Sequence, residues 1–217
     1  MKTSSSKFLF SLCLGVLLLL GSSAAQAVVL TFEGLGDQES INNYYAGGFG
    51  GSGSGPGPNY GITFTSDSLS VIDADNGGSG NFSNNPSGHT IMFFLNGADT
   101  MNVAAGFTTG FSFFYANNGG DGLVSVYSGL NGTGTLLTTL SLPNTPNPFN
   151  VWVPVGVSFG GTAMSVVWSG SANHIGFDDV TLGSNRPGLP DGGSTIMLMG
   201  MAFAGIAVLK RKLVSVR

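Results

Sequence analysis

The chain from Val28 to Gly183 consists of short runs rich in β-branched and aromatic residues, each bounded by Gly, Asn, Pro or Ser. No stretch of useful length shows the apolar spacing of an amphipathic helix. Short runs separated by turn residues are typical of β-strands. Roughly 155 residues is an ordinary size for one domain. The sequence therefore predicts one all-β ectodomain over residues 28–183, a β-sandwich of jelly-roll type.

The expected strands are Val28–Glu33, Gly61–Thr65, Leu69–Asp73, His89–Leu95, Phe107–Ala116, Gly122–Tyr127, Thr135–Leu142, Phe149–Phe159, Ala163–Trp168 and Asn173–Leu182. Between them, the glycine-rich turns after Ala116 and after Tyr127 are typical of hairpin loops. One connection is much longer than the others, the Gly- and Ser-rich stretch Asp37–Asn59. Long loops of this kind are commonly functional or mobile, so we expect a flexible surface loop there.

The few charged residues are unevenly placed. The chain has 7 Lys and Arg residues, and none of them lies between residues 8 and 185. Ten of its 11 acidic residues lie between Val28 and Asn185. Binding to a phosphate backbone requires clustered cations, so this distribution excludes nucleic acid as a partner. The single cysteine, Cys13, excludes a disulfide framework and a cysteine-based zinc site.

Residues 1–27 have the features of a cleaved signal peptide. The basic segment Met1–Lys7 precedes the apolar run Phe8–Leu20, and Ala25-Gln26-Ala27 follows in the small-residue form of a cleavage site. The apolar run is shorter than the ~20 residues that a permanent membrane span needs, although an uncleaved anchor is the alternative. The sequence predicts cleavage by signal peptidase after Ala27.

The C-terminal residues have the features of a membrane segment. Residues 184–193 are rich in Pro and Gly and form a linker that cannot continue as a helix. Residues 194–217 contain an apolar run that ends at Leu209 and a basic cluster directly after it. The run is slightly short for a hydrocarbon core of about 30 Å. The sequence predicts one transmembrane helix with a cytoplasmic C-terminus, and a buried core helix is the alternative.

This tail resembles the sorting signal of PEP-CTERM proteins, most closely the V-P-D-G-G form. The resemblance rests on an apolar helix flanked by motif residues and basic residues, namely Pro190, Asp191, Gly192, Gly193, Ser194, Thr195, Lys210, Arg211 and Lys212. Leu189 replaces the usual valine, and Leu213–Arg217 extends beyond the basic cluster.

The resemblance implies several properties of the protein. It implies export through the inner membrane of a Gram-negative bacterium, with the precursor held there transiently. It implies processing by a membrane-embedded exosortase and delivery to the cell surface or an exopolysaccharide matrix. It implies no catalytic activity of the sorted protein itself.

The ectodomain has a looser resemblance of its own. The segments Val126–Leu136 and Ile175–Gly183 are similar to lectin-like and galactose-binding-like jelly rolls that carry such tails. In jelly rolls of this kind the first and last strands pair.

Catalytic residues are poorly supported by the sequence. The only histidines that could act as a base are His89 and His174, each at the start of an expected strand. Histidines at strand ends are commonly just solvated. Paired carboxylates could hydrolyse glycosides, but no pattern here pairs them across a cleft. We therefore predict a protein that is not an enzyme, with a polysaccharide-active hydrolase as the second alternative.

Calcium is the cofactor that the sequence best supports, because calcium prefers oxygen ligands. In the last expected strand the apolar phase slips by one residue at Asp178-Asp179, which is how a β-bulge reads in sequence. If the first and last strands pair, Glu33 lies close to these two aspartates. We therefore expect a calcium site at Glu33, Asp178 and Asp179. The alternative is that these carboxylates cap backbone N–H groups.

Two further groups of residues are weaker candidates for binding. The acidic turn Asp73–Asn81 partly resembles a calcium-binding nonapeptide, and a plain polar loop is the alternative. Aromatic residues suited to stacking on sugar rings lie around the long loop and in a later strand, namely Tyr44, Tyr45, Phe49, Tyr60 and Trp152. Trp152 alternates with valines and is expected on the face opposite to them. Core packing is the alternative for each aromatic residue.

These observations predict an exported, exosortase-processed protein of the cell surface or exopolysaccharide matrix, without catalytic activity. The first alternative is a calcium-dependent carbohydrate-binding module, for which the exopolysaccharide is the expected partner.

Overall fold

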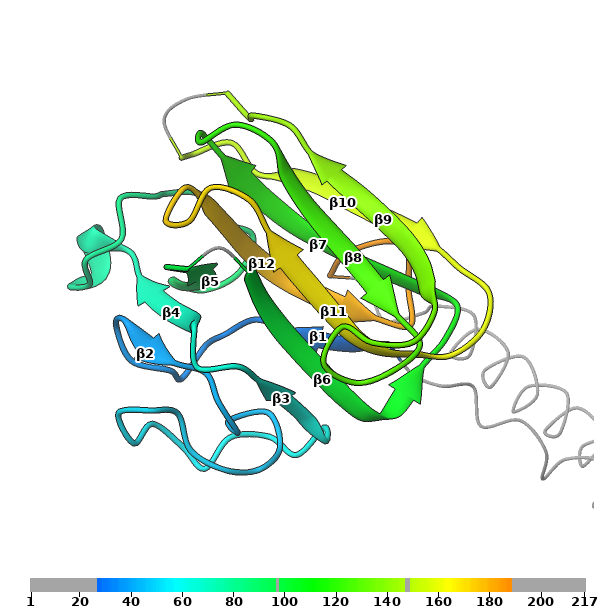
Figure 1. Cartoon of the computed structure of the whole chain (residues 1–217). Helices are drawn as coiled ribbons and strands as arrows, with labels where there is room; N and C mark the ends of the chain where they lie inside the picture. The colour runs from blue at the N-terminus through cyan, green and yellow to red at the C-terminus, as the bar shows by residue number, and fades with distance from the viewer. Residues whose placement is uncertain (1–26, 97, 147–148, 189–217) are drawn as a thin grey trace, which may run out of the picture. The chain divides into compact units, whose positions relative to one another are not determined.

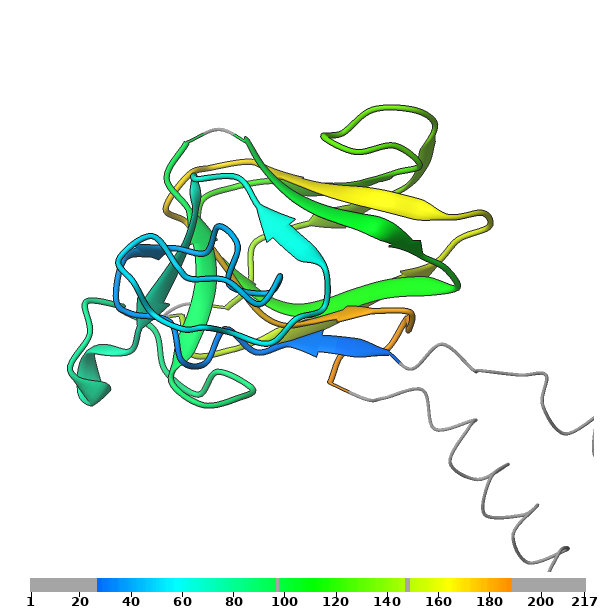
Figure 2. The ribbon, with the colours of Figure 1, turned by 90° about the horizontal axis from the view of Figure 1, so that it is seen from below.

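The computed structural model describes residues 27–188 except residue 97 and residues 147–148. Two antiparallel sheets pack face to face (Figures 1 and 2). The elements are β1 (Val28–Leu30), β2 (Glu39–Ser40), β3 (Ile62–Phe64), β4 (Ser68–Ile72), the 3-10 helix η1 (Ala74–Asn76), β5 (Thr90–Phe94), β6 (Ala98–Phe107), β7 (Gly110–Asn117), β8 (Gly122–Tyr127), β9 (Leu136–Leu142), β10 (Val153–Ser158), β11 (Ala163–Ser169) and β12 (Ile175–Leu182). The predicted all-β sandwich is confirmed.

The two sheets differ in size and strand order. The 7-stranded sheet has the order β10-β7-β12-β5-β4-β2, with β1 also paired to β12. The 5-stranded sheet has the order β3-β6-β11-β8-β9. All eight residues of β12 are buried, and the strand lies inside its sheet, paired with β7, β5 and β1. The expected pairing of the first and last strands is present, with Val28 opposite Leu182.

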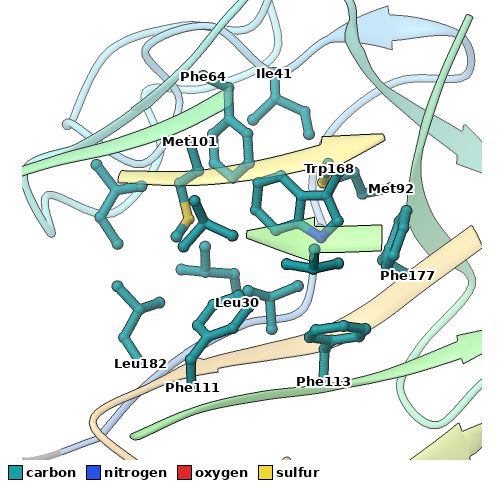
Figure 3. Close-up of a cluster of buried hydrophobic side chains, with 14 of the residues drawn as sticks. Leu30, Ile41, Phe64, Met92, Met101, Phe111, Phe113, Trp168, Phe177 and Leu182 are labelled. Carbon is teal, nitrogen blue, oxygen red and sulfur yellow. The ribbon is translucent and has the colours of Figure 1, made fainter. Parts of the chain in front are cut away.

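A core rich in aromatic residues joins the sheets (Figure 3). Trp168 of β11 is fully buried, and its ring lies 6.2 Å from Phe64 in its own sheet. It also lies 6.1 Å from Phe111 and 5.9 Å from Phe177, both in the facing sheet. Edge-to-face rings at these spacings add to the free energy gained by burial alone.

The main error in the strand prediction is β6, of which only the last residue, Phe107, lies in an expected strand. Met101 and Val103 are buried and alternate with Thr100 and Asn102, so the period of two is present. It was obscured because Asp99, a charged residue, takes an inward position and is only 1% exposed. The expected strand Phe107–Ala116 is also divided, since β6 ends at Phe107 and a turn at Thr108-Thr109 precedes β7.

The long segment 37–59 is packed against the domain, contrary to the expected flexible loop. Ile41, Tyr44 and Tyr45 belong to the main core. The fully buried carboxylate of Glu39 organises the glycine-rich part, accepting hydrogen bonds from the backbone N–H groups of Gly36, Ser52 and Ser54 at 2.6, 2.7 and 3.0 Å. Burial raises the pKa of Glu39, but these hydrogen bonds lower it by more, so the pKa lies below its usual value. A Cβ atom at Gly50 would lie 2.5 Å from this carboxylate, so a glycine is needed there.

Candidate functional site

The β-bulge expected at the two aspartates is present. The pairing of β12 with β7 shifts register between Asp178 and Thr181. Asp179 has a φ angle of 48°, a left-handed conformation that aspartate tolerates better than most residues. The bulge places both aspartates in buried positions.

Asp178 is held by the segment that precedes β5. Its carboxylate accepts hydrogen bonds from the Ser87 N–H at 3.0 Å, the Ser87 hydroxyl at 3.1 Å and the Asn85 amide at 3.3 Å. The N–H of Asp179 donates to it at 2.7 Å. Burial raises the pKa of Asp178 to about 7, and the negative charge of Asp179 acts in the same direction. The hydrogen bonds offset only part of this increase.

Glu33 holds the same segment a few residues further on. Its carboxylate accepts from the N–H groups of His89 and Thr90 at 2.9 and 2.8 Å. Glu33 and Asp178 therefore cap backbone N–H groups on either side of Gly88. Within residues 27–188, apart from the three undescribed positions, no three Asp, Glu, His or Cys side chains are arranged to hold a metal. The structure shows the capping arrangement, and a calcium ion at this place stays a prediction.

The second acidic candidate, Asp73–Asn81, forms a turn around η1. The Asp73 carboxylate accepts from the N–H of Asp75 at 3.0 Å and from the amide of Asn76 at 3.4 Å. Asp73 thus caps the 3-10 helix, as short polar side chains commonly do at helix starts. This geometry corresponds to the polar loop rather than to a calcium loop.

The two histidines are both exposed. His174 Nδ1 lies 2.8 Å from the Asn118 side-chain oxygen. In the described part of the chain, neither imidazole makes a hydrogen bond to a carboxylate or to a nucleophilic hydroxyl. An arrangement of nucleophile, base and orienting acid is therefore not found among those residues.

The predicted aromatic candidates separate into core and surface residues. Tyr44 and Tyr45 are buried in the core and cannot stack on a ligand. Phe49 and Tyr60 are 54% and 46% exposed. Trp152 is half-buried and lies on the outer face of the 7-stranded sheet, whereas Val153, Val155 and Val157 pack against the main core. The predicted placement of Trp152 opposite the valines is confirmed for Val153 and Val155, whereas Val151 is exposed.

Trp152 belongs to a second, smaller hydrophobic cluster on this outer face. The cluster consists of Val71, Phe82, Ile91 and Phe93, with Leu69, Phe149 and Trp152 packed against it. The ring of Trp152 meets Phe82 edge-on at 6.1 Å, and its indole N–H donates to the Ser83 carbonyl at 3.0 Å. Residues 149–152 therefore cover the sheet instead of extending β10, which corrects the predicted strand Phe149–Phe159.

A cleft of about 340 Å³ opens beside this cluster. Its apolar surface comes from Val71, Ile91, Phe93 and Ile175 on the sheet, and from the covering residues Phe82 and Phe149. Its polar side chains are Gln38, Ser79, Asn81 and Asn173. Ligand sites typically combine such an apolar surface with a few polar groups, and the volume is at the small end of the usual range of about 300–1,000 Å³.

Two amides of the cleft are free to bind a ligand. Asn81 and Asn173 are exposed, and their side chains make no hydrogen bond to any described residue. Gln38 donates to the Ser79 hydroxyl at 2.7 Å. The sequence did not predict that these three amides meet, because they come from separate loops that only the tertiary fold brings together. The sequence signals near the cleft were the candidate turn Asp73–Asn81, to which Asn81 belongs, and the position of Trp152.

Two groups of predicted residues lie outside the described part of the chain. They are residues 1–26 of the predicted signal peptide and the sorting residues Pro190, Asp191, Gly192, Gly193, Lys210, Arg211 and Lys212. The boundaries of the terminal segments stay predictions. No helix of the described part is both long enough and apolar enough to cross a membrane.

Comparisons with known structures find carbohydrate-binding domains. The chain is similar to the β-1,3-glucan-binding module from Bacillus halodurans, with 18% identity and a TM-score of 0.36 over 54% of this chain and 87% of that one. It is also similar to a carbohydrate-binding module from Cellvibrio mixtus lichenase 5A in complex with cellotriose, with 12% identity and a TM-score of 0.37 over 55% of this chain and 88% of that one.

A hydrolase is among the similar structures too. It is the Bacillus subtilis arabinoxylan arabinofuranohydrolase of glycoside hydrolase family 43, with 20% identity, a TM-score of 0.38 and coverage of 57% of this chain. The chain spans only 26% of that enzyme's length. Similarity at these levels transfers neither a ligand nor an activity. No curated protein matches the chain in sequence.

The tail gives a direct match to a family model. Residues 190–213 match the VPDSG-CTERM motif. The chain reads Leu-Pro-Asp-Gly-Gly at residues 189–193, so Gly192 takes the place of the serine in that motif's name. The C-terminus of this protein therefore carries a sorting signal of the PEP-CTERM type, behind a β-sandwich domain.

Proposed function

We propose that the protein is an exported, exosortase-processed component of the cell surface or exopolysaccharide matrix, without catalytic activity. The observation that carries this proposal is the VPDSG-CTERM match at residues 190–213. A non-catalytic role is supported by three of the acids, because the half-buried Glu33 and the buried Glu39 and Asp178 are engaged in capping backbone N–H groups.

The arrangement of β12 supports display at a surface. Its C-terminal end pairs with Val28 and leads towards the tail. Its N-terminal end, at Ile175 and Gly176, lines the cleft. Leu182 is six positions after Gly176, which is about 20 Å at ~3.3 Å per residue. A protein held through its tail would thus have its cleft towards the end of β12 remote from the attachment.

Deletion of the exosortase gene tests the sorting route. We expect the protein to accumulate in the inner membrane with its tail attached, whereas the wild-type strain releases a shorter form to the surface. Mass spectrometry and cell fractionation measure both effects. An identical mass and location in the two strains would show that the sorting proposal is wrong.

As a second function we propose carbohydrate binding in the cleft. The support is its combination of apolar residues, such as Ile91 and Phe93, with free amides at Asn81 and Asn173. The C–H faces of a sugar ring suit the apolar surface, and its hydroxyls both donate and accept hydrogen bonds, as amides do. The small volume favours a site for a short stretch of a polymer.

Two variants test this function without disturbing the fold. Asn81→Ala removes one free amide. Asn173→Gly removes the other and tolerates the left-handed φ of 61° at that position. We expect each variant to weaken binding on a glycan array by about 3- to 10-fold, the equivalent of ~1 kcal/mol for one hydrogen bond.

The matched control is Asn43→Ala. Asn43 is exposed, does not line the cleft and makes no side-chain hydrogen bond to a described residue. It should bind like the wild type. Equal binding by all variants would place any glycan site elsewhere, and repeating the array with EDTA measures whether binding depends on calcium.

A further inference from the structure

The cleft on the outer face of the 7-stranded sheet has a distinctive chemical character, because every residue that lines it is uncharged. From this we infer that the cleft selects neutral sugars and rejects acidic ones, an inference that rests on the carbohydrate-binding function proposed above. Its polar side chains are three amides, Gln38, Asn81 and Asn173, and the hydroxyl of Ser79. These groups match hydroxyl and acetamide substituents, which also both donate and accept.

An acidic sugar would find no cationic partner in this cleft. Proteins that recognise carboxylates, phosphates or sulfates commonly pair them with Arg or Lys. No Lys or Arg lies between residues 8 and 185. Arg186, the one such residue in the described part, follows the end of β12 remote from the cleft. A uronic acid carboxylate would therefore lose its hydration in the cleft without forming an ion pair.

A carboxylate beside the cleft has the wrong sign of charge for binding an acidic sugar. Asp37 directly precedes Gln38, and its carboxylate accepts hydrogen bonds from the N–H groups of Ile72 at 2.9 Å and Ser79 at 3.1 Å. Partial burial raises the pKa of Asp37, but the hydrogen bonds lower it by more, so the pKa lies below its usual value. This carboxylate is therefore ionised at neutral pH. An anion beside Gln38 and Ser79 would be repelled.

A cationic sugar is attracted by the negative charge of Asp37 but has no charged partner inside the cleft. No carboxylate lines it, so a glucosamine ammonium group would be held only by the overall negative charge of the domain. Binding of that kind is screened by salt. Neutral sugars are the class whose groups are all satisfied by the lining residues.

Oligosaccharide pairs that differ only in charge test the inference. Cello-oligosaccharides and β-1,3-gluco-oligosaccharides are compared by calorimetry with their counterparts oxidised to carboxylates at C6. We expect each neutral probe that binds to do so at least ~10-fold more tightly than its acidic counterpart, about 1.4 kcal/mol. De-N-acetylated chito-oligosaccharides should bind only at low salt, with an affinity that Asn81→Ala does not change.

A charged variant makes the test stricter. Gln38→Arg places a cation at the rim of the cleft and should raise the affinity for the acidic probes several-fold, so that the difference from the neutral probes shrinks. Asn43→Arg adds the same charge away from the cleft and should leave the preference unchanged.

The outcomes separate this inference from the proposed function. If the acidic probes bind the wild type as tightly as the neutral ones, and Asn81→Ala weakens both, glycan binding stands and the selection for neutral sugars is wrong. If none of the neutral probes binds, both proposals are overturned. If Gln38→Arg and Asn43→Arg have equal effects, the discrimination arises from net charge and not from the cleft.

Discussion

At the scale of single residues, the buried Asp178 in the bulge of β12 makes the free energy of unfolding depend on pH. Burial raises its folded-state pKa to about 7, whereas an unfolded aspartate has a value near 3.9. Between these values the folded state binds more protons than the unfolded state. The free energy of unfolding therefore falls as the pH rises from about 4 to about 7. Asp99 and Asp179, whose pKa values burial also raises, contribute with the same sign.

We predict that Asp178→Asn makes this pH dependence shallower, since the uncharged side chain no longer binds a proton. One titrating group contributes a slope of at most about 1.4 kcal/mol per pH unit. Urea unfolding at several pH values between 4 and 8 measures the slope. Asp121→Asn, at an exposed acid, is the control and should keep the wild-type slope. An unchanged slope in Asp178→Asn would contradict the prediction.

Calcium binding at the buried aspartates stays a prediction, and its effect on the Tm can be measured. Ten acids between Val28 and Asn185 have no Lys or Arg among them, and Asp179 is buried in a left-handed conformation. A cation that binds only the folded state adds about 2.7 kcal/mol when it is 100-fold above its Kd. For a domain of this size, we expect EDTA to lower the Tm by several degrees.

Asp179→Asn tolerates the same backbone conformation and should lower the Tm to the value measured with EDTA. Magnesium and sodium at matched ionic strength control for charge screening. A Tm that does not respond to EDTA would leave the aspartates with the capping role that the structure shows.

At the scale of elements, residues 184–188 are held against the sandwich after β12 ends. The Ser112 hydroxyl donates to the Ser184 carbonyl at 2.9 Å, and the Asn185 amide donates to the Ser158 hydroxyl at 3.0 Å. The Gly188 N–H donates to Thr181 Oγ1 at 3.0 Å, while that hydroxyl donates to the Asp179 carbonyl at 2.8 Å. The first part of the predicted linker is therefore fixed to the bulge, and Pro190 of the sorting motif follows two residues later.

We predict that Thr181→Val releases this segment. Valine has nearly the same shape, so the buried side chain still fits, but the Asp179 carbonyl and the Gly188 N–H lose their partner. The expected loss is about 1–3 kcal/mol of unfolding free energy. Limited proteolysis should then cut within residues 184–188 at a lower protease concentration. Thr138→Val, on the half-buried β9, is the control. Equal cleavage of both variants would show that the Thr181 hydroxyl does not hold the segment.

At the scale of the whole molecule, the predicted mature N-terminus is part of the fold. β1 begins at Val28, the first residue after the predicted cleavage site, and this residue pairs with Leu182. The first and last segments of the domain are thus neighbours in one sheet, close to the point where the chain continues to its tail. Cleavage after Ala27 would leave β1 complete.

We predict that the exported protein starts at Val28. N-terminal sequencing measures this directly, with the precursor from cells blocked in signal peptidase as the control. Ala27→Leu should block cleavage, because a large residue replaces the small one next to the cleavage site. An intact Met1 on the exported protein would show that the N-terminal segment is a permanent anchor.

The sequence by itself determined the features that depend on local order. The sorting signal of the tail can be recognised, and the signal peptide predicted, because each consists of adjacent segments with a fixed succession of charge and hydropathy. The strands follow from periodicity and turn residues, and even the bulge at Asp178-Asp179 is visible as a slip in that periodicity. The failure at β6 has a local cause as well, since Asp99 takes an inward position that patterns assign to apolar residues.

Only the tertiary structure decided which distant residues meet. The carboxylate of Glu39 accepts from Ser52 and Ser54, and that of Asp178 accepts from Ser87 about 90 positions away in the chain. Nothing near either acid in the sequence indicates these partners, because backbone N–H groups are present at almost every residue. The cleft arises in the same way, from Gln38, Asn81 and Asn173 on three loops. Local propensity fixes each strand, but the register and packing of the sheets determine where the loops converge, and a binding site depends on that convergence.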